Sequence, residues 1–129
     1  MAIKDQKNII KVLGTIAPQA ALGNLTGTTV DVEGFEAVTL YGHGDATAIG
    51  TIKIQHSDAS GSGFTDASAT EVIGTQDIAL NATYTDVTIG YIGSKRYVRA
   101  FYTDGTNGDV SAAFLLGHAS ISPVSGNDN

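Results

Sequence analysis

The run from Gly90 to Tyr102 constrains the fold of this chain most strongly, because its side chains alternate in the way that a β-strand requires. One phase holds Val98, Ala100 and Tyr102, and the other holds Tyr97, Arg99 and Phe101. Successive side chains of a strand point to opposite faces of a sheet, so this period of two predicts a long strand with two different environments. The alternation by itself leaves open which of the two faces is buried.

Other segments of strand length share this alternation or a β-branched composition. They cover residues 28–32, 35–42, 49–56, 70–74, 84–90 and 110–116. The content of 16 glycines favours many tight turns between these segments. Residues 104–108 carry both an Asp-Gly and an Asn-Gly pair, which are typical of β-hairpins. No helical pattern separates the strands, so the sequence predicts an all-β fold, a single antiparallel β-sandwich with a jelly roll as its candidate topology.

The length of the chain favours one domain. A chain of 129 residues is long enough for one compact core and too short for two ordinary domains. Residues 1–27 are predicted to be an extended N-terminal arm and docking segment, which is locally basic through Lys4, Lys7 and Lys11. Residues 28–120 are the predicted sandwich, and residues 121–129 are a short C-terminal tail without periodicity.

The composition disfavours several classes of function. A net charge of −6 argues against nucleic acid as a partner, since an acidic surface repels phosphates. The absence of cysteine excludes disulfides, thiolate catalysis and cysteine-ligated zinc. No run of about 18 apolar residues and no apolar leader occurs, so we expect no membrane partner and synthesis in the cytoplasm.

The three histidines form no catalytic pattern in the sequence. His43, His56 and His118 are separated by strand-length intervals. His56 lies in the apolar phase of its segment and is predicted to be a hydrogen-bonded, partly buried side chain. His43 has Asp45 nearby, but no serine stands in a nucleophile elbow and no phosphate-binding loop occurs. The sequence therefore predicts no catalytic residue and no cofactor, and we do not expect an enzyme.

Acidic loop residues raise calcium as a ligand. One group is Asp58 and Asp66 around a Gly/Ser loop, and a second group is Asp104, Asn107 and Asp109. Neither group has the spacing of a calcium-binding loop with a terminal Glu, so solvated turns are the preferred interpretation and no metal site is predicted. Phe64, which follows the Gly/Ser loop, is expected to fold this loop back onto the core.

Two further sets of residues leave alternatives open. Lys95, Arg96 and Arg99 either form a cationic patch for an acidic partner or pair across strands with some of the 13 carboxylates. Five aromatic residues either form a sugar-binding platform or belong to the core, and the core is preferred because strand-spaced aromatics usually pack inside. These five are Tyr84, Tyr91, Tyr97, Phe101 and Tyr102.

Three segments carry a family resemblance. They are residues 30–37, residues 54–59 with the loop that leads to Phe64, and residues 90–99, which are the most distinctive. These segments resemble a group of small structural proteins of tailed bacteriophages, often encoded beside the major capsid protein and interpreted as head decoration or accessory virion proteins. The likeness covers about residues 28–123 and includes the closing Leu115-Leu116-Gly117-His118.

The resemblance implies a β-rich domain without catalysis, made in the host cytoplasm and repeated many times on the capsid surface of the virion. The implied partners are the major capsid protein and further copies of the chain, above all in a homotrimer. The expected attachment residues are Lys4, Lys7 and Lys11 of the arm, with Lys95, Arg96 and Arg99 as a second surface. The competing class is a carbohydrate-binding or adhesion module whose polar loops recognise the ligand.

Overall fold

The computed structural model describes residues 10–119, and the regular secondary structure in this range consists of β-strands alone. Six strands have six to eleven residues, and the others have two or three. The strands are β1 (Lys11–Ala20), β2 (Leu25–Thr26), β3 (Val30–Asp31), β4 (Phe35–Gly44), β5 (Ile49–Ser57), β6 (Thr65–Asp66), β7 (Val72–Ile73), β8 (Ile78–Leu80), β9 (Asp86–Tyr91), β10 (Tyr97–Thr106) and β11 (Asp109–Ala119). The all-β prediction is confirmed.

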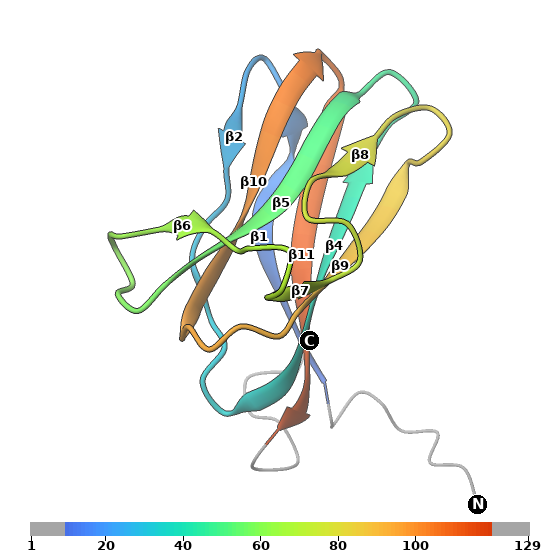
Figure 1. The fold of residues 1–129 in the computed structure, drawn as a ribbon. Coiled ribbons are helices and arrows are strands. Elements are labelled where there is room, and N and C mark those ends of the chain that lie inside the picture. The colour runs from blue at the N-terminus through green and yellow to red at the C-terminus, as the bar shows by residue number, and fades with distance from the viewer. Residues whose placement is uncertain (1–9, 120–129) are drawn as a thin grey trace, which may run out of the picture.

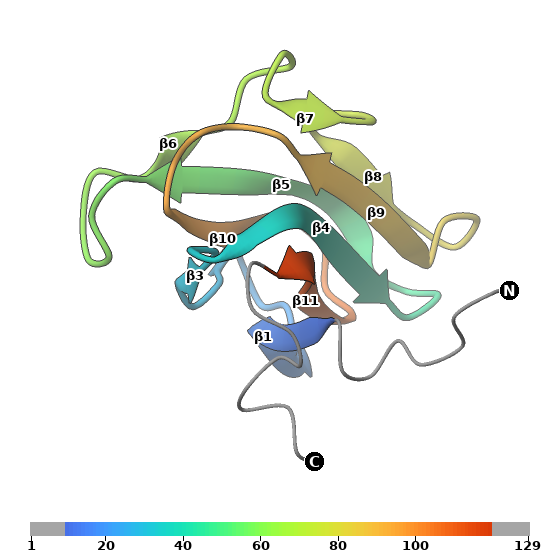
Figure 2. The same ribbon diagram turned by 90° about the horizontal axis from the view of Figure 1, so that it is seen from below.

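The strands form two antiparallel sheets that pack against each other. The five-stranded sheet has the order β1-β11-β4-β9-β7. The six-stranded sheet follows β2-β10-β5-β6, with β3 also paired to β10 and β8 also paired to β5. In Figure 1, β10 and β5 lie in front of β1 and β11, and Figure 2 shows the two layers from below. The predicted antiparallel sandwich is confirmed.

The order of the strands is that of a jelly roll. β2 and β3 pair with successive parts of β10, and β6 and β8 pair with successive parts of β5, so each of these two sets fills one strand position. Four positions in one sheet, β1-β11-β4-β9, then face four positions in the other, and β7 is an addition at the edge. Apart from β5 and β6, successive positions lie in different sheets, as in the double Greek key of a jelly roll.

The turn at residues 104–108 does not make a hairpin, which corrects the sequence prediction. β10 belongs to the six-stranded sheet and β11 to the five-stranded sheet, so the chain crosses between the sheets at Asn107 and Gly108. Asp-Gly and Asn-Gly pairs favour a tight reversal, but the reversal does not specify the strand with which the chain pairs afterwards.

The described part of residues 1–27 belongs to the sandwich and not to an arm. β1 pairs antiparallel with β11 along its length and forms one edge of the five-stranded sheet. Thr15 ties β1 to the other sheet, because its hydroxyl donates to the Thr28 carbonyl at 2.8 Å and accepts from the Ala100 N–H at 3.1 Å. The sandwich therefore begins at Lys11 instead of residue 28.

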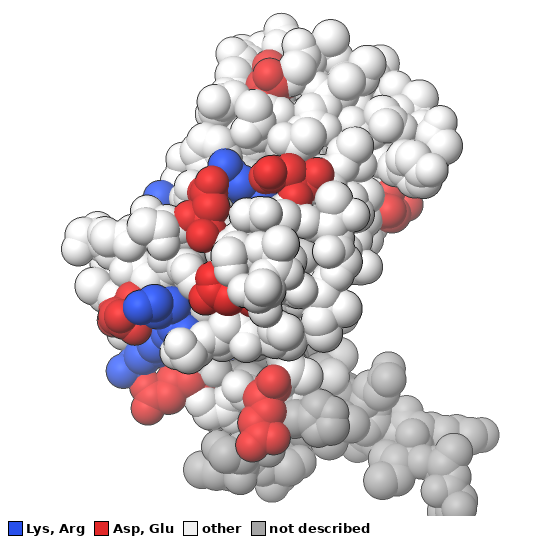
Figure 3. Space-filling model, in the orientation of Figure 1, with Lys and Arg blue, Asp and Glu red and all other residues white. Residues whose placement is uncertain are grey.

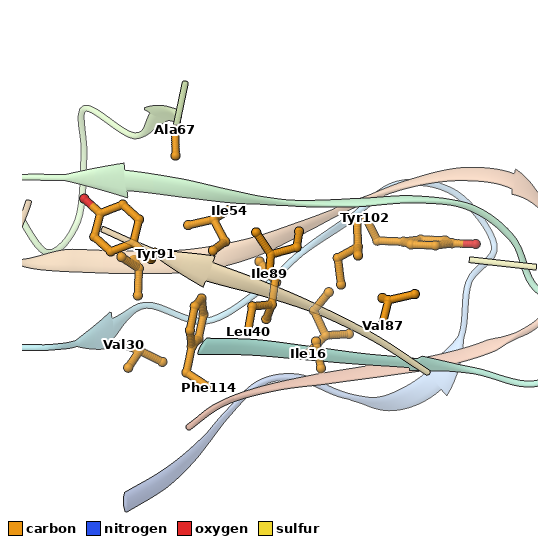
Figure 4. Packing of buried hydrophobic residues seen from close by; sticks show 14 of the residues in the cluster. Ile16, Val30, Leu40, Ile54, Ala67, Val87, Ile89, Tyr91, Tyr102 and Phe114 are labelled. Carbon is orange, nitrogen blue, oxygen red and sulfur yellow. The ribbon is translucent and has the colours of Figure 1, made fainter. Parts of the chain in front are cut away.

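The core lies between the sheets and takes one phase from each long strand (Figure 4). In β10 the buried phase is Val98, Ala100 and Tyr102. The opposite phase carries Arg99, whose charge would lose its hydration without compensation between two apolar layers. In Figure 4 the rings of Tyr91 and Tyr102 lie toward opposite ends of the cluster, with Phe114 between them. This arrangement leaves the outer faces of the two sheets available for function.

Candidate functional site

The outer side of the six-stranded sheet and its adjoining loops carry paired charges. Figure 3 shows Lys and Arg side chains beside Asp and Glu side chains on this side of the molecule. Lys95 Nζ lies 2.7 Å from Asp58 Oδ2, and Lys53 Nζ lies 2.8 Å from Asp66 Oδ2. The hydrogen bond from Lys53 holds the pKa of Asp66 below its usual range. These cations already have carboxylate partners within the chain.

Arg96 makes the most extensive of these ion pairs. Its Nε and Nη2 atoms donate to the two carboxylate oxygens of Asp31 at 3.1 and 2.8 Å, and its Nη1 lies 2.7 Å from Glu33 Oε2. The hydrogen bond from Arg96 lowers the pKa of Asp31, and the same bond raises the pKa of Arg96. Arg96 thereby joins the start of β10 to β3 and to the turn before β4, which is the cross-strand alternative of the sequence analysis.

Arg99 contacts neutral groups instead of a carboxylate. Its Nε donates to Gln55 Oε1 at 2.9 Å, and its guanidinium carbon lies 4.1 Å from the ring centroid of Phe64. Phe64 therefore anchors its loop onto the outer face of the six-stranded sheet, and not onto the core as expected. A guanidinium over an aromatic face gains about 0.5–1 kcal/mol at an exposed site.

The five aromatic residues do not form a sugar-binding platform. Tyr91 and Tyr102 are buried in the core. The rings of Tyr97 and Phe101 lie beneath cations, with Arg96 at 5.1 Å and Lys53 at 5.3 Å from the ring centroids. Tyr84 lies elsewhere, between β8 and β9, and is 60% exposed.

The three segments of the family resemblance meet at one end of the sandwich. A cleft of about 420 Å³ lies between residues 32–36 and residues 91–96. A second hollow of about 380 Å³ is lined by residues 56–59 and by parts of the loop that follows, and it shares Lys95 with the first. Glu33, Glu36 and Arg96 also line the first cleft. This end of the fold is therefore polar, and most of its described charged side chains form ion pairs with one another.

His56 is buried beside this end and is hydrogen-bonded, as the sequence predicted. Its Nδ1 lies 2.8 Å from Tyr91 Oη and 3.8 Å from Glu71 Oε2. The Lys95 N–H donates to Tyr91 Oη at 3.1 Å, so this hydroxyl links the Lys95 backbone to the His56 ring. Burial raises the pKa of Tyr91 and favours its protonated form. No sequence signal linked Glu71 or Tyr91 to His56, because long-range folding brings them together.

The outer face of the five-stranded sheet is different, because it carries no ionised side chain over most of its area. The strand registers place Ser111, His43 and Asp86 in one end row of this face and uncharged residues over the rest of it. Eleven of these uncharged residues form what we call the neutral face: Val12, Gly14, Ala37, Thr39, Tyr41, Ile73, Thr88, Gly90, Ala113, Leu115 and Gly117. Among them, Val12 is 52%, Leu115 38% and Ile73 64% exposed. None of the eleven residues is buried. The sequence analysis missed this face, since it depends on which strands become neighbours.

His43 and Asp86 lie at one end of the neutral face. His43 Nδ1 lies 2.7 Å from Asp86 Oδ1, and the Tyr41 hydroxyl donates to the same carboxylate. These bonds, with that of Tyr41 the larger cause, hold the pKa of Asp86 below its usual range. Asp45, the acid nearest to His43 in the sequence, instead accepts hydrogen bonds from the N–H groups of Thr47 and Ala48.

Within residues 10–119, no group of three or more His, Asp or Glu side chains is arranged to hold a metal ion. In the first calcium candidate, Asp58 and Asp66 bind lysines, as described above. In the second, the Asp109 N–H donates to Asp45 Oδ2 at 3.2 Å, a bond between residues far apart in the sequence. The same described range contains no helix that is long and apolar enough to cross a lipid bilayer.

The predicted attachment residues fall into two groups. Lys95, Arg96 and Arg99 lie near one another but have partners within the chain, and Lys11 stands in β1. Lys4, Lys7 and the predicted tail 121–129 lie outside the described residues.

Comparisons of the chain with protein-family models, with curated proteins and with solved structures find no match. The resemblance to phage proteins stays a prediction from its three sequence segments.

Proposed function

We propose that this protein is a non-enzymatic structural component of a phage virion, which binds the outside of the assembled head and stabilises contacts between capsid proteins. The neutral face is the observation that carries the proposal, together with the family resemblance. The centres of protein interfaces are depleted of charged residues, because burying an ionised group is costly. On a chain of net charge −6, a face without ionised side chains is suited to burial against another protein.

The neutral face is a better attachment surface than the cations near the start of β10. Lys95 and Arg96 would have to exchange their present carboxylate partners for those of a capsid protein, which gains little. Among residues 10–119, the neutral face has no such bonds to break, apart from the Tyr41 hydroxyl bond to Asp86. Lys4 and Lys7 keep the role of a second, electrostatic contact in this proposal, and a homotrimer remains a prediction.

The first test is the number of copies per particle, measured by quantitative mass spectrometry of purified virions of the phage that carries the gene. We expect a copy number comparable to that of the major capsid protein, because a decoration protein occupies repeated sites. Absence from virions, or presence in only a few copies, would overturn the proposal of a capsid-wide component.

The second test compares two threonines in equivalent places on the two sheets. Thr39 lies in the middle of the neutral face, and Thr51 lies on the outer face of the six-stranded sheet, with both side chains half-buried. We expect Thr39→Asp to reduce the affinity for undecorated heads by at least about tenfold, since it buries an unpaired carboxylate. Thr51→Asp should bind as the wild type does. Equal binding by both variants would exclude the neutral face as the attachment surface.

A further inference from the structure

A groove lies at the seam between the two sheets. It shares Thr88 with the neutral face and Asp86 with the His43 pair, and its other lining residues belong to neither. It runs between β8, at the edge of the six-stranded sheet, and β9 of the five-stranded sheet, and its volume is about 550 Å³. This size lies within the range of roughly 300–1,000 Å³ that is typical of small-molecule sites. Val87 is buried and Ile78 half-buried against the core, so these two provide an apolar floor. Thr75 and Thr88 add hydroxyl groups to the lining.

Tyr84 provides an exposed aromatic ring at this groove. It is 60% exposed, and its backbone is fixed by a closed turn. Asn81 Oδ1 accepts from the N–H groups of Thr83 and Tyr84, both at 2.9 Å, and the Asn81 N–H donates to the Tyr84 carbonyl at 3.1 Å. The rings of Tyr97 and Phe101 are covered by cations, whereas within the described residues no cation lies over Tyr84. The face of this ring is available for stacking.

Two carboxylates provide hydrogen-bond acceptors in the same groove. Asp77 and Asp86 both line it. Asp86 is held in place by Tyr41 and His43 on its Oδ1 atom, while its Oδ2 atom has only a long contact of 3.4 Å with the Thr85 hydroxyl. An ionised carboxylate that is already oriented accepts strong hydrogen bonds from ligand hydroxyls. Its position is set before the ligand arrives, which reduces the entropic cost of binding.

We propose that this groove binds a neutral hexopyranoside, with one apolar face of the sugar stacked on Tyr84 and its hydroxyl groups donating to Asp86 and Asp77. A pyranose ring combines a C–H face with a rim of hydroxyl donors, and the groove combines an aromatic face with carboxylate acceptors. The two carboxylates and the acidic chain repel anionic sugars, so uronic and sialic acids are disfavoured. The groove shares only Thr88 with the neutral face, so most of its lining lies outside the proposed attachment surface, and a decorated head would carry it in many copies.

The experiment is an NMR titration of the full-length, ¹⁵N-labelled protein with the methyl glycosides of glucose, galactose, mannose and N-acetylglucosamine. We expect at least one of them to shift the amides of residues 75–79 and 84–88, with a Kd on the order of 1 mM, as befits an open site. Methyl glucuronide should bind at least about tenfold more weakly than methyl glucoside or than the preferred glycoside.

Three variants separate stacking from hydrogen bonding. Tyr84→Ala should weaken binding by about tenfold or more, while Tyr84→Phe, which keeps the ring, should stay within about threefold of the wild type. Asp77→Asn should weaken binding by several-fold. Ile92→Ala is the matched control, because Ile92 is also exposed, at 59%, but lies outside the groove. Its binding should be unchanged, and Tyr84→Ala should still attach to heads.

Two results would overturn the inference. One is the absence of amide shifts in the groove with all four glycosides at concentrations up to about 100 mM, a hundredfold above the expected Kd. The other is shifts that persist unchanged in Tyr84→Ala, which would place the sugar elsewhere on the protein.

Discussion

The two outer faces of this sandwich are built from strands with the same alternation, yet they expose different chemistry. On the six-stranded side, Lys53, Arg96 and Arg99 bind carboxylates, an amide and aromatic rings of neighbouring segments. On the five-stranded side, the neutral face presents small and uncharged side chains, including Val12 and Leu115 in direct register. Polar alternation was sufficient to predict the strands, but it did not decide which phase is buried and did not require charge on both outer surfaces. The difference indicates that the charged side chains of one face find their partners within the chain, whereas the other face is suited to binding a partner protein.

The largest expected effect tests whether the neutral face is separate from the core. Phe114 and Leu115 are adjacent in β11, the first fully buried and the second 38% exposed. Phe114→Ala should cost about 3–5 kcal/mol in the free energy of unfolding, because it leaves a cavity between the sheets. Leu115→Ala should cost about 1 kcal/mol or less. Urea denaturation of the two variants measures both values. Equal losses would mean that the neutral face contributes to folding as the core does.

A smaller effect is expected from the paired charges of the other face. Arg96→Ala removes bonds to Asp31 and Glu33, and we expect a fall in Tm of about 3 °C at low salt. Salt screens exposed charges, so this difference should shrink at 1 M NaCl. Arg99→Ala is the matched variant, because its partners Gln55 and Phe64 are uncharged. Its loss should depend little on salt, and the same salt response in both variants would contradict the assignment of partners.

The smallest effect concerns acid, and part of it should again come from the six-stranded side. The pKa values of Asp31 and Asp66 are lowered from an ordinary value of 3.8 by Arg96 and Lys53. A carboxyl whose folded pKa is depressed contributes stability that is complete above its unfolded pKa and is lost as the pH falls through the folded pKa. The Tm should therefore decrease as the pH drops below about 4.

The double variant Asp31→Asn/Asp66→Asn provides the control for the acid prediction. Both carboxylates stand in pairs with cations on the six-stranded side, while the neutral face has no carboxylate. Calorimetry of the double variant between pH 5 and 2.5 should show a smaller fall in Tm than in the wild type, by about 1–2 °C. An unchanged fall would place the acid-sensitive carboxylates elsewhere.

Much of the fold could be predicted because the required information is local. Five of the six long strands were predicted close to their observed ends, since alternation and turn residues act over a few neighbours, whereas β1 lies within the segment that was predicted to be an arm. The turn at Gly34 is an example, with φ of 89° and a hydrogen bond from the Phe35 N–H to the Val32 carbonyl. His56 was identified as a hydrogen-bonded histidine from its phase alone.

The candidate sites were less predictable because they combine residues that are distant in the sequence. His43 was placed near Asp45, but its partner is Asp86 on the neighbouring strand β9. The neutral face and the groove beside Tyr84 both require the final strand order. Alternation restricts each side chain to one of two faces and does not identify the neighbour across the sheet.

The sequence by itself determined that this protein is a cysteine-free, acidic chain of short strands and tight turns, with a period of two that demands a sheet. Only the tertiary structure decided that the phase with Tyr102 is buried and that β10 and β11 separate into different sheets. Strand propensity and turn chemistry are set by adjacent residues, whereas pairing, register and burial are set by the packing of two whole sheets against each other. The surfaces on which function depends belong to this second, long-range class.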